Sequence, residues 1–578
     1  MTKKTQKLQR IAALSLAGLL SCSGLTACNG IDPHKNQSHL NIKVFNGGFG
    51  HEWLKELISS FEETFKDVSF EEGKKGVHVA LTPNKEFTDL HLKMAMGTDA
   101  EDIYYTSTSD FLPFIDNEVA YDVTDIMTAN VYDENGEVVL NADGNGWKTQ
   151  EGYQSIVDRI SLETTRERLN MGTEENPKYM VLPFEDTVTG FVVDWDLFVE
   201  QGWNDYNGID GMPATIYEFY DLLGRIRKKG YSGFIFSTGV QYSKTIQPAV
   251  IAQVEGSDVW YDLFSDYIGE YDFNEDGEIT VDERITPNTA YKLIDTKGYE
   301  EAVNMAFKLF EQTDNGKTFY DPAVVNGISY GAAQQDFLMS KETNTRIAML
   351  IEGEWWENEA RATFNAMSTN NDENAYGERE FRMMPIPSFD ETNGDPDDPS
   401  DDRYTLGTWT GGCAVVVNEK TVGDDPVKQE LAKLWLQYQN STEGLKCFTK
   451  HTSVTLPLEY ELDEDELEEL TPFGRNLYKL KRDSRVEIIH RSISIEAEHV
   501  YRGGVKLDFA ARIQIGNAVG KYTDPLFNNM AKSLYNKNLT AKDYIQGLHT
   551  NYDEPFKNAD FKLADYGINL DDYWTTEE

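Results

Sequence analysis

Apolar and polar residues follow one another in patterns that predict strands and helices in alternation. The β-rich run 41–45 is broken by two glycines, and apolar residues then recur at helical spacing between Trp53 and Phe65. Short apolar runs at 78–81 and 102–105 predict a second and a third strand. A β-α-β-α-β order favours a parallel sheet that is covered by helices.

The same alternation continues in the middle of the chain. Residues 215–218, Thr-Ile-Tyr-Glu, have the sequence of a capping box, and a helix with an apolar face follows them. Arg and Lys in its last turns suit the helix dipole, and Gly230 ends it. A strand is predicted at 233–236, and Asp425-Pro426 predicts the start of another helix. We therefore expect an α/β fold.

The first 27 residues have the pattern of a lipoprotein signal. A basic start precedes an apolar run at 11–20 that is too short to span a bilayer comfortably. The sequence Leu-Thr-Ala-Cys at 25–28 resembles a bacterial lipobox. We predict a signal over 1–27, lipidation of Cys28 and a polar tether over 28–39, with a plain secretory signal as the alternative. Two acyl chains give stable anchoring, which predicts a protein held at the extracellular face of the bacterial cytoplasmic membrane.

The charge excludes some partners. The chain has 53 basic and 99 acidic residues and a net charge of −46. Loss of the four cations of the signal would bring it to −50. Such acidity argues against nucleic-acid binding and against direct adhesion to anionic lipid. After loss of the signal and lipidation of Cys28, two cysteines are left, Cys413 and Cys447. They either form a disulfide or stay as two buried thiols.

Residues 272–283 match the twelve-residue calcium loop of an EF-hand. Gly277 occupies the turn position, and the expected oxygen ligands are Asp272, Asn274, Asp276, the carbonyl of Glu278, and bidentate Glu283. Apolar residues at helical spacing over 260–268 predict an entering helix, and Pro287 shortens the exiting one. We predict one bound Ca2+ with a structural role. The alternative is an acidic turn without metal.

Several segments occur in an order that is typical of one family. They are 44–61, 102–105, 121–124, 179–183, 190–198, 213–215, 346–356, 385–387 and 411–412. In this order and spacing the chain resembles the extracellular solute-binding proteins (family 1) of carbohydrate ABC transporters, the group that includes maltose-binding protein. The chain is longer than most of that family, with extra length between about 242 and 318 and near Asp395.

The resemblance implies a two-lobed, periplasmic-binding-protein-like (type II) fold. Each lobe would be a mixed sheet flanked by helices, and hinge crossings near 185–190, 409–412 and 453–456 would join the lobes. The implied parts are an N-terminal lobe of 40–187 plus 410–454 and a C-terminal lobe of 188–409 plus 455–578, with a calcium-binding insertion at about 258–290. We expect a monomer.

The resemblance also implies a sugar site between the lobes. Trp355 matches the sugar-stacking tryptophan of the family. Further candidates are placed by position at strand ends and crossings: Asn46, Phe49, Ser109, Asp110, Glu185, Asp186, Trp409 and Arg502. Helix capping is the alternative role for Asn46, Ser109 and Asp110. Few cations lie among these residues, which favours a neutral oligosaccharide over a uronate.

The expected function is non-enzymatic. The resemblance implies a lipoprotein that captures an oligosaccharide and delivers it to the permease subunits of an ABC importer. The alternative is a secreted, calcium-containing enzyme that degrades polysaccharides. The sequence has no HExxH, GxSxG or P-loop motif that would support a hydrolase or nucleotide site.

Overall fold

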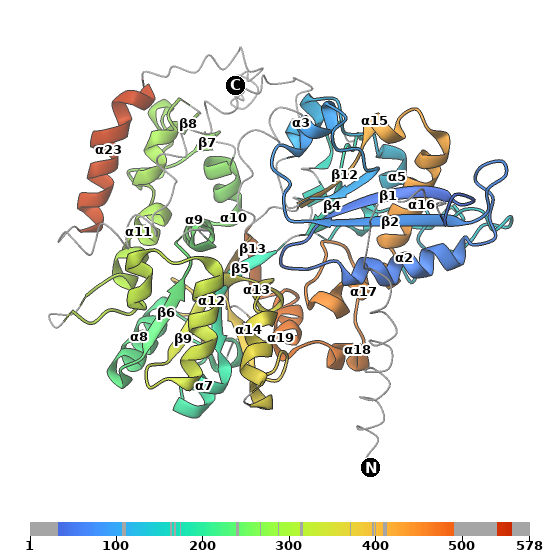
Figure 1. Ribbon diagram of the computed structural model, residues 1–578. Coiled ribbons are helices and arrows are strands. Elements are labelled where there is room, and N and C mark those ends of the chain that lie inside the picture. Colours follow the sequence, from blue (N-terminus) through green and yellow to red (C-terminus); the bar gives the residue numbers. More distant parts are fainter. Residues whose placement is uncertain are drawn as a thin grey trace.

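The computed structural model describes most of the chain. The described residues are 33–489 and 540–557, without 107–110, 162–164, 167–168, 174, 186, 239–241, 266–267, 287, 313–315, 370, 396–397, 399, 401 and 409–412. Two separate sheets, each with its own hydrophobic core, form two lobes that lie side by side (Figure 1). The two-lobed α/β architecture was predicted.

The first lobe is built on a five-stranded sheet. The strand order is β2 (Val77–Asn84), β1 (Ser38–Phe45), β3 (Ile103–Tyr105), β12 (Cys413–Val417), β4 (Leu182–Glu185). The pairs β1–β2 and β1–β3 are parallel, as the β-α-β-α-β pattern predicted, whereas β12 runs antiparallel to both of its neighbours. Helices that contribute to its core are α2 (Glu52–Thr64), α16 (Pro426–Gln439) and α17 (Thr442–Thr452).

The second lobe is built on a six-stranded mixed sheet. The order along its main path is β13 (Val486–Ile489), β11 (Tyr404–Thr408), β5 (Val188–Asp194), β9 (Ile347–Gly353), β6 (Ser232–Phe236), and β10 (Phe381–Met384) pairs with β5. Helices that contribute to its core are α8 (Ile216–Lys229), α9 (Ile246–Glu255), α11 (Lys297–Leu309) and α12 (Tyr330–Met339). Among the described residues, no helix is long and apolar enough to span a membrane.

The predicted helix signals act as expected. The Thr215 side chain accepts a hydrogen bond from the Glu218 N–H, and the Glu218 carboxylate accepts one from the Thr215 N–H, which completes the capping box of α8. Gly230 then adopts φ +86°, which ends the helix at little steric cost. In α16, Asp425 accepts hydrogen bonds from the backbone of Val427 and Lys428.

Two chain segments join the sheets and pair with each other. Residues 182–194 form β4 in the first sheet and β5 in the second, and residues 404–417 return as β11 and β12. The two segments are antiparallel on both sides of the junction, with Ala414 opposite Pro183 and Thr408 opposite Val188. The first crossing lies within 185–190, as predicted. The second was predicted at 409–412, and these residues lie outside the described part of the chain, between the ends of β11 and β12.

The third crossing lies later in the chain than predicted. We placed it near 453–456, but the apolar residues Leu456, Leu458, Tyr460, Leu462, Leu467 and Leu470 all belong to the first core. Phe473 is the first residue after them that packs in the second core. The chain therefore returns to the second lobe near Thr471, because the apolar run after α17 continues to cover the first lobe.

The predicted entering helix of the calcium loop is only partly present. A short helix, α10 (Ser257–Val259), continues as a π-helical turn over Trp260–Ser265. The chain then forms an antiparallel ladder of β7 (Gly269–Glu270) with β8 (Arg284–Ile285). A Glu270–Arg284 ion pair of 3.0 Å supports this ladder. A two-stranded ladder thus closes the loop, where we had expected a pair of helices.

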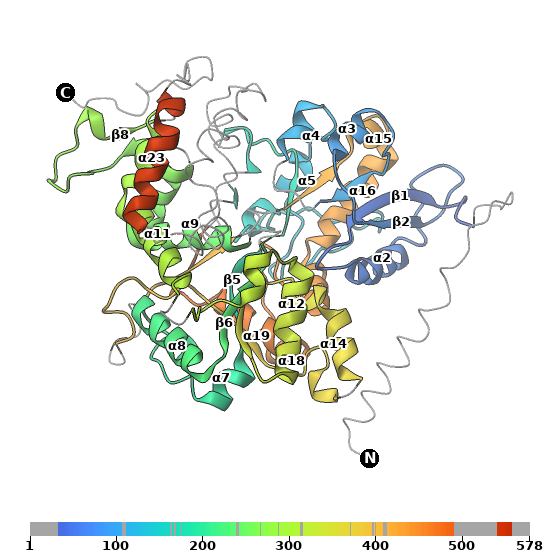
Figure 2. The same cartoon turned by 60° about the vertical axis from the view of Figure 1, so that its left-hand side comes forward.

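Helix α23 (Ala541–Lys557) packs beside α11 on the outer side of this lobe (Figure 2).

One buried ion cluster ties three parts of the second lobe together. The fully buried carboxylate of Asp194 accepts hydrogen bonds from Arg346 at 2.9 Å and Arg379 at 2.8 Å. Its other oxygen caps α7 (Trp195–Gln201) by accepting from the Leu197 N–H. Arg379 is only 1% exposed and pairs with this carboxylate, whereas Arg346 also lies 3.8 Å from the Glu200 carboxylate.

We expect Asp194→Asn to lower the free energy of unfolding by about 3–5 kcal/mol, because it leaves the buried Arg379 guanidinium without its ion-pair partner and weakens the pairing of Arg346. Urea denaturation measures this loss. Asp205→Asn is the control, since Asp205 forms an exposed pair with Arg225 and should cost less than about 1 kcal/mol. Equal losses in the two variants would contradict the role assigned to the buried cluster.

Candidate functional site

A pocket lies at the carboxyl edge of the first sheet. It has a volume of about 240 Å³ and follows the ends of β1, β2 and β3. Its lining residues are Phe45, Lys85, Phe87, Thr88, Leu90, Thr106 and Phe114. Open α/β sheets bind ligands beyond the carboxyl ends of their strands, so this edge is the expected place for a ligand. Aromatic rings and one cation together suit a polar ligand with apolar faces.

Trp355 of the second lobe meets the first lobe beside this edge. It stands between the end of β9 and α13 (Trp356–Glu359) and is 7% exposed. A Cβ atom added to Gly48, in the loop after β1, would lie 2.7 Å from the Trp355 Cβ. A Cβ added to Gly353 would lie 2.2–2.4 Å from the indole ring. Two glycines, one from each lobe, therefore make the space that Trp355 occupies. Tyr242 packs edge-on against the same ring at 5.2 Å.

Two carboxyl groups, one buried and one partly buried, lie near Trp355. Glu352 is fully buried; its Oε1 accepts from the Gly353 N–H at 3.2 Å, and its Oε2 has no hydrogen-bond partner among the described residues. Burial raises the pKa of Glu352 well above its ordinary value, and the Glu359 carboxylate adds to this shift. Burial also raises the pKa of Glu359, and Lys85 of the first lobe opposes that shift. Charged groups of both lobes thus act on one another across this junction.

A third carboxyl group fastens the first crossing segment. Glu354 accepts a hydrogen bond from the Val188 N–H at 2.9 Å, and its own N–H donates to the Val188 carbonyl at 3.1 Å. Lys481 pairs with the same carboxylate at 3.2 Å. The crossing strand is therefore held at its first residue by the turn that carries Trp355.

The structure describes only some of the predicted ligand residues. Asn46 lies in the loop after β1 and its Oδ1 pairs with His51 Nδ1 at 3.2 Å. Phe49 packs edge-on against Phe448 at 5.6 Å and so contributes to the first core. Only the backbone of Glu185 is described. The remaining predictions lie outside the described residues: Cys28, Ser109, Asp110, Asp186, Trp409 and Arg502.

Sequence reasoning missed several residues that line the junction. Lys85 follows the second strand directly, so the strand-end rule that selected Asn46 would also have selected it. Glu352 lies inside an apolar strand, where one acidic residue was an available signal. Tyr242 comes from the stretch where the chain is longer than the family it resembles, and no pattern marked it.

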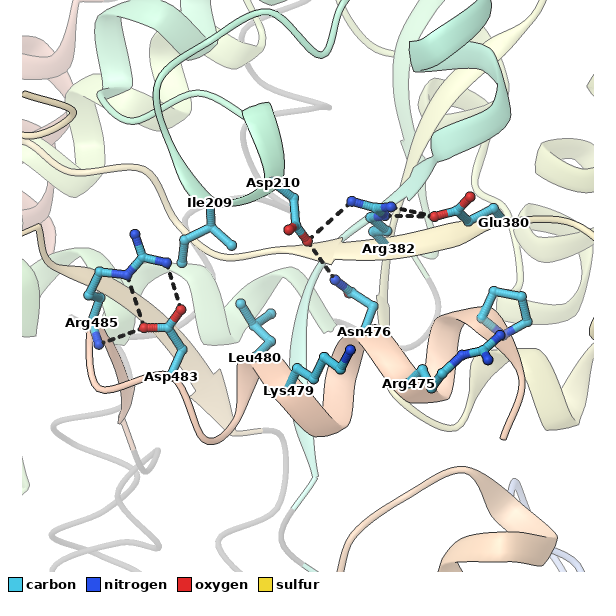
Figure 3. A pocket seen from close by; sticks show the side chains of 11 residues that line it. Ile209, Asp210, Glu380, Arg382, Arg475, Asn476, Lys479, Leu480, Asp483 and Arg485 are labelled. Carbon is cyan, nitrogen blue, oxygen red and sulfur yellow. Dashed lines mark hydrogen bonds and ion pairs between the residues drawn. The ribbon is translucent and has the colours of Figure 1, made fainter. Parts of the chain in front are cut away.

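A larger cavity lies within the second lobe. It has a volume of about 460 Å³ and is lined by η2 (Ile209–Gly211), β10, α19 (Pro472–Leu480) and the turn before β13 (Figure 3). Its acids are already paired: Asp210 with Arg382 at 3.2 Å, and Asp483 with Arg485 at 2.7 Å. None of its lining residues comes from the first sheet. This cavity therefore does not place a ligand between the lobes.

In the loop 272–283, side-chain oxygen atoms accept hydrogen bonds from the backbone of the loop. No three of its carboxylates lie close enough together in the described structure to bind one ion. The Gly277 N–H donates to Asp272 Oδ2 at 2.7 Å, and the Asp276 N–H donates to Asn274 Oδ1 at 2.9 Å. Glu283 is turned to Thr280 and accepts from its N–H and hydroxyl. These bonds lower the pKa of Glu283. The donor set is oxygen only, which fits Ca2+, but Glu283 would have to turn inward to bind it.

Comparison with known proteins supports the fold. No family model and no curated protein sequence matches the chain. Three similar solved structures are "SBP RafE in complex with raffinose", the apo-form of RafE from Streptococcus pneumoniae, and a chitin oligosaccharide binding protein. Each is 12% identical, with TM-scores of 0.51, 0.52 and 0.51. The matches cover 90%, 91% and 90% of this chain and 100%, 100% and 99% of those chains. At this identity the likeness shows the two-lobed fold.

A buried carboxyl group next to the third crossing should make stability depend on pH. Glu357 is 2% exposed; its Oε2 accepts from the Thr471 hydroxyl at 2.6 Å, and its Oε1 has no partner in the described part of the chain. Burial raises the pKa of Glu357 from 4.5 to about 7. The folded protein thus holds a proton that the unfolded chain releases at a lower pH. The contribution of Glu357 to the free energy of unfolding is therefore most favourable below about pH 4.5, and it is lost as the pH rises to about 7.

We expect Glu357→Gln to remove this dependence and to stabilise the protein at pH 7 by up to about 3 kcal/mol, because the amide cannot ionise. Urea denaturation at several pH values between 4.5 and 8 measures the difference from the unmodified protein. Glu63→Gln, at an exposed helix position, is the control. A variant curve parallel to that of the unmodified protein would contradict the prediction.

Proposed function

We propose that the protein is the substrate-binding component of an ABC importer and captures an oligosaccharide between its two lobes. The observation that carries the proposal is the meeting of Trp355 with Gly48 beside the strand-end pocket of the first sheet. An indole can stack on the apolar face of a sugar, and the surrounding carboxyl groups can accept hydrogen bonds from its hydroxyls. The named ligands of two structural neighbours, raffinose and chitin oligosaccharide, support a carbohydrate.

The proposed mechanism is a change in the distance between the lobes. Paired crossing strands permit a hinge movement, and a ligand that contacts both lobes shifts the equilibrium towards the closed form. Trp355 fills the space left by Gly48 and Gly353, so a ligand would separate Trp355 from Gly48 or enter beside it. The closed form would then be recognised by permease subunits. A lipid on Cys28 would hold the protein, as a monomer, at the outer face of the cytoplasmic membrane.

We expect Trp355→Phe to weaken oligosaccharide binding about tenfold, because the smaller ring loses stacking area. Calorimetric titration with a panel of neutral oligosaccharides, raffinose and chitin fragments among them, measures the affinities. Trp203→Phe is the matched control, since Trp203 is 4% exposed and packs in the second core. Unchanged affinity in Trp355→Phe would exclude the stacking role.

The same titrations separate the proposal from its alternative. Saturable binding with no new reducing ends supports a binding protein. Release of reducing ends from the bound glycan would overturn the proposal in favour of a polysaccharide-degrading enzyme.

We also propose that the loop 272–283 binds one Ca2+ and stabilises the insertion of the second lobe. Its support is the spacing of the oxygen donors and the inward hydrogen bonding of Asp272 and Asn274. The ion would neutralise part of the acidic charge that this loop concentrates.

We expect Ca2+ in excess over its dissociation constant to raise the melting temperature, since a hundredfold excess contributes about 2.7 kcal/mol by linkage. Asp272→Asn should abolish the shift and make the loop more sensitive to proteolysis. Asp133→Asn is the matched control. Asp133 stabilises a similar acidic turn by accepting a hydrogen bond from the Asn135 N–H at 2.8 Å. A melting temperature that is the same with and without Ca2+ would exclude the site.

A further inference from the structure

We propose a second metal site, for zinc, formed by Glu56, Cys447 and His451 on the first lobe. One potential ligand atom of each residue lies within 4.8 Å of the other two. Among the described residues, this is the only group of three or more His, Cys, Asp or Glu residues gathered so closely. The site is independent of the proposed sugar and calcium sites.

Two packed helices position the three side chains. Cys447 and His451 are four residues apart on α17, so they lie on one face of that helix. Glu56 is on α2, and the helices are held together by Trp53, whose ring packs edge-on against Phe448 at 5.0 Å. The core contact therefore fixes the distance between the carboxylate and the other two ligands.

The three ligand atoms are close enough for side-chain adjustments to bring them around one ion. Glu56 Oε2 and His451 Nε2 are 2.9 Å apart, and Cys447 Sγ lies within 4.8 Å of both. The Cys447 thiol donates to the Trp53 carbonyl at 3.6 Å, and this bond would break when the thiolate binds the ion. Zinc bonds of 2.0–2.3 Å in a tetrahedron separate the ligand atoms by about 3.3–3.8 Å. The present Glu56–His451 contact would therefore open by less than about 1 Å as the ion enters.

The ligand types favour zinc over the hard cations. A thiolate, an imidazole and a carboxylate are zinc ligands, whereas Ca2+ and Mg2+ prefer oxygen alone. The Glu56 side chain is 65% exposed and that of His451 34%, so an ion can enter from solvent and keep a fourth position for water. Burial raises the pKa of the Cys447 thiol to about 12, so the metal has to displace its proton.

The ion would lie beside contacts between the lobes. Arg361 donates a hydrogen bond to the His451 carbonyl at 3.2 Å, and Asn358 donates to the Thr452 carbonyl at 2.6 Å. Both donors come from the second lobe. Zinc would thus hold the last turn of α17 against α2 at the point where this turn meets the other lobe.

Titration of the metal-free, full-length protein with Co2+ and then with Zn2+ tests the proposal. We expect one Zn2+ per chain and, with Co2+, a thiolate-to-metal charge-transfer band in the near ultraviolet. Cys447→Ser should abolish the band. His451→Gln should weaken zinc binding by more than about 100-fold, the upper end of the loss that removal of an outer-shell partner causes. Melting curves without metal check that both variants remain folded.

Matched controls make the result specific. His549 forms an ion pair with Asp295 at 2.9 Å, so His549→Gln removes a similar pair at another place and should leave zinc affinity unchanged. Cys413→Ser and Cys28→Ser should retain the charge-transfer band. No stoichiometric zinc binding, or a band that persists in Cys447→Ser, would overturn the proposal. Excess Ca2+ should not displace the zinc, and displacement would assign the ion to the loop 272–283 instead.

Discussion

The rest of the structure depends on the antiparallel pairing of two crossing segments. Each of two segments, 182–194 and 404–417, supplies one strand to the first sheet and another strand to the second. Neither sheet is complete without them. The two lobes are therefore joined by strands that are hydrogen-bonded to each other on both sides of the junction. Glu354 adds a fixed point, since its side chain and backbone both bind Val188. The turn that carries Trp355 is thereby tied to the crossing itself.

The acidic residues set the net charge of the protein, and several of them also have individual structural roles. A net charge of −46 disfavours binding to anionic partners, but several acids are buried in the second lobe and at the junction, where they bind specific groups. Asp194 pairs with two arginines, and Glu354 binds the first residue of the crossing strand. Glu352 and Glu357 each leave one oxygen without a partner in the described chain, and burial raises both pKa values. Buried acids whose oxygens are all hydrogen-bonded or ion-paired stabilise the fold. Glu352 and Glu357 instead lower the free energy of unfolding at neutral pH, because their ionisation is unfavourable in the folded protein.

Local signals in the sequence predicted most of the first lobe and the helix boundaries that depend on caps. Thr215, Gly230 and Asp425 act over three or four residues, so their effect does not depend on the rest of the fold. The third crossing was misplaced because no local signal tells which of two cores an apolar run will cover. The ladder at Glu270 and Arg284 was missed for a related reason: strands of two residues have no periodicity to detect. Trp355 was proposed by resemblance, whereas its contact with Gly48 depends on how the two lobes meet and has no local signal in the sequence.

The same limit explains why the two proposed metal sites differ in how they can be recognised. The loop 272–283 has its ligands within twelve consecutive residues, so spacing alone points to it. Glu56 is nearly four hundred residues from Cys447 and His451, and only the packing of α2 on α17 brings them together. Their donors also separate them, since oxygen ligands select hard cations and a thiolate selects softer ones. One ion would therefore stabilise an insertion of the second lobe, and the other would fasten the first lobe where it meets the second.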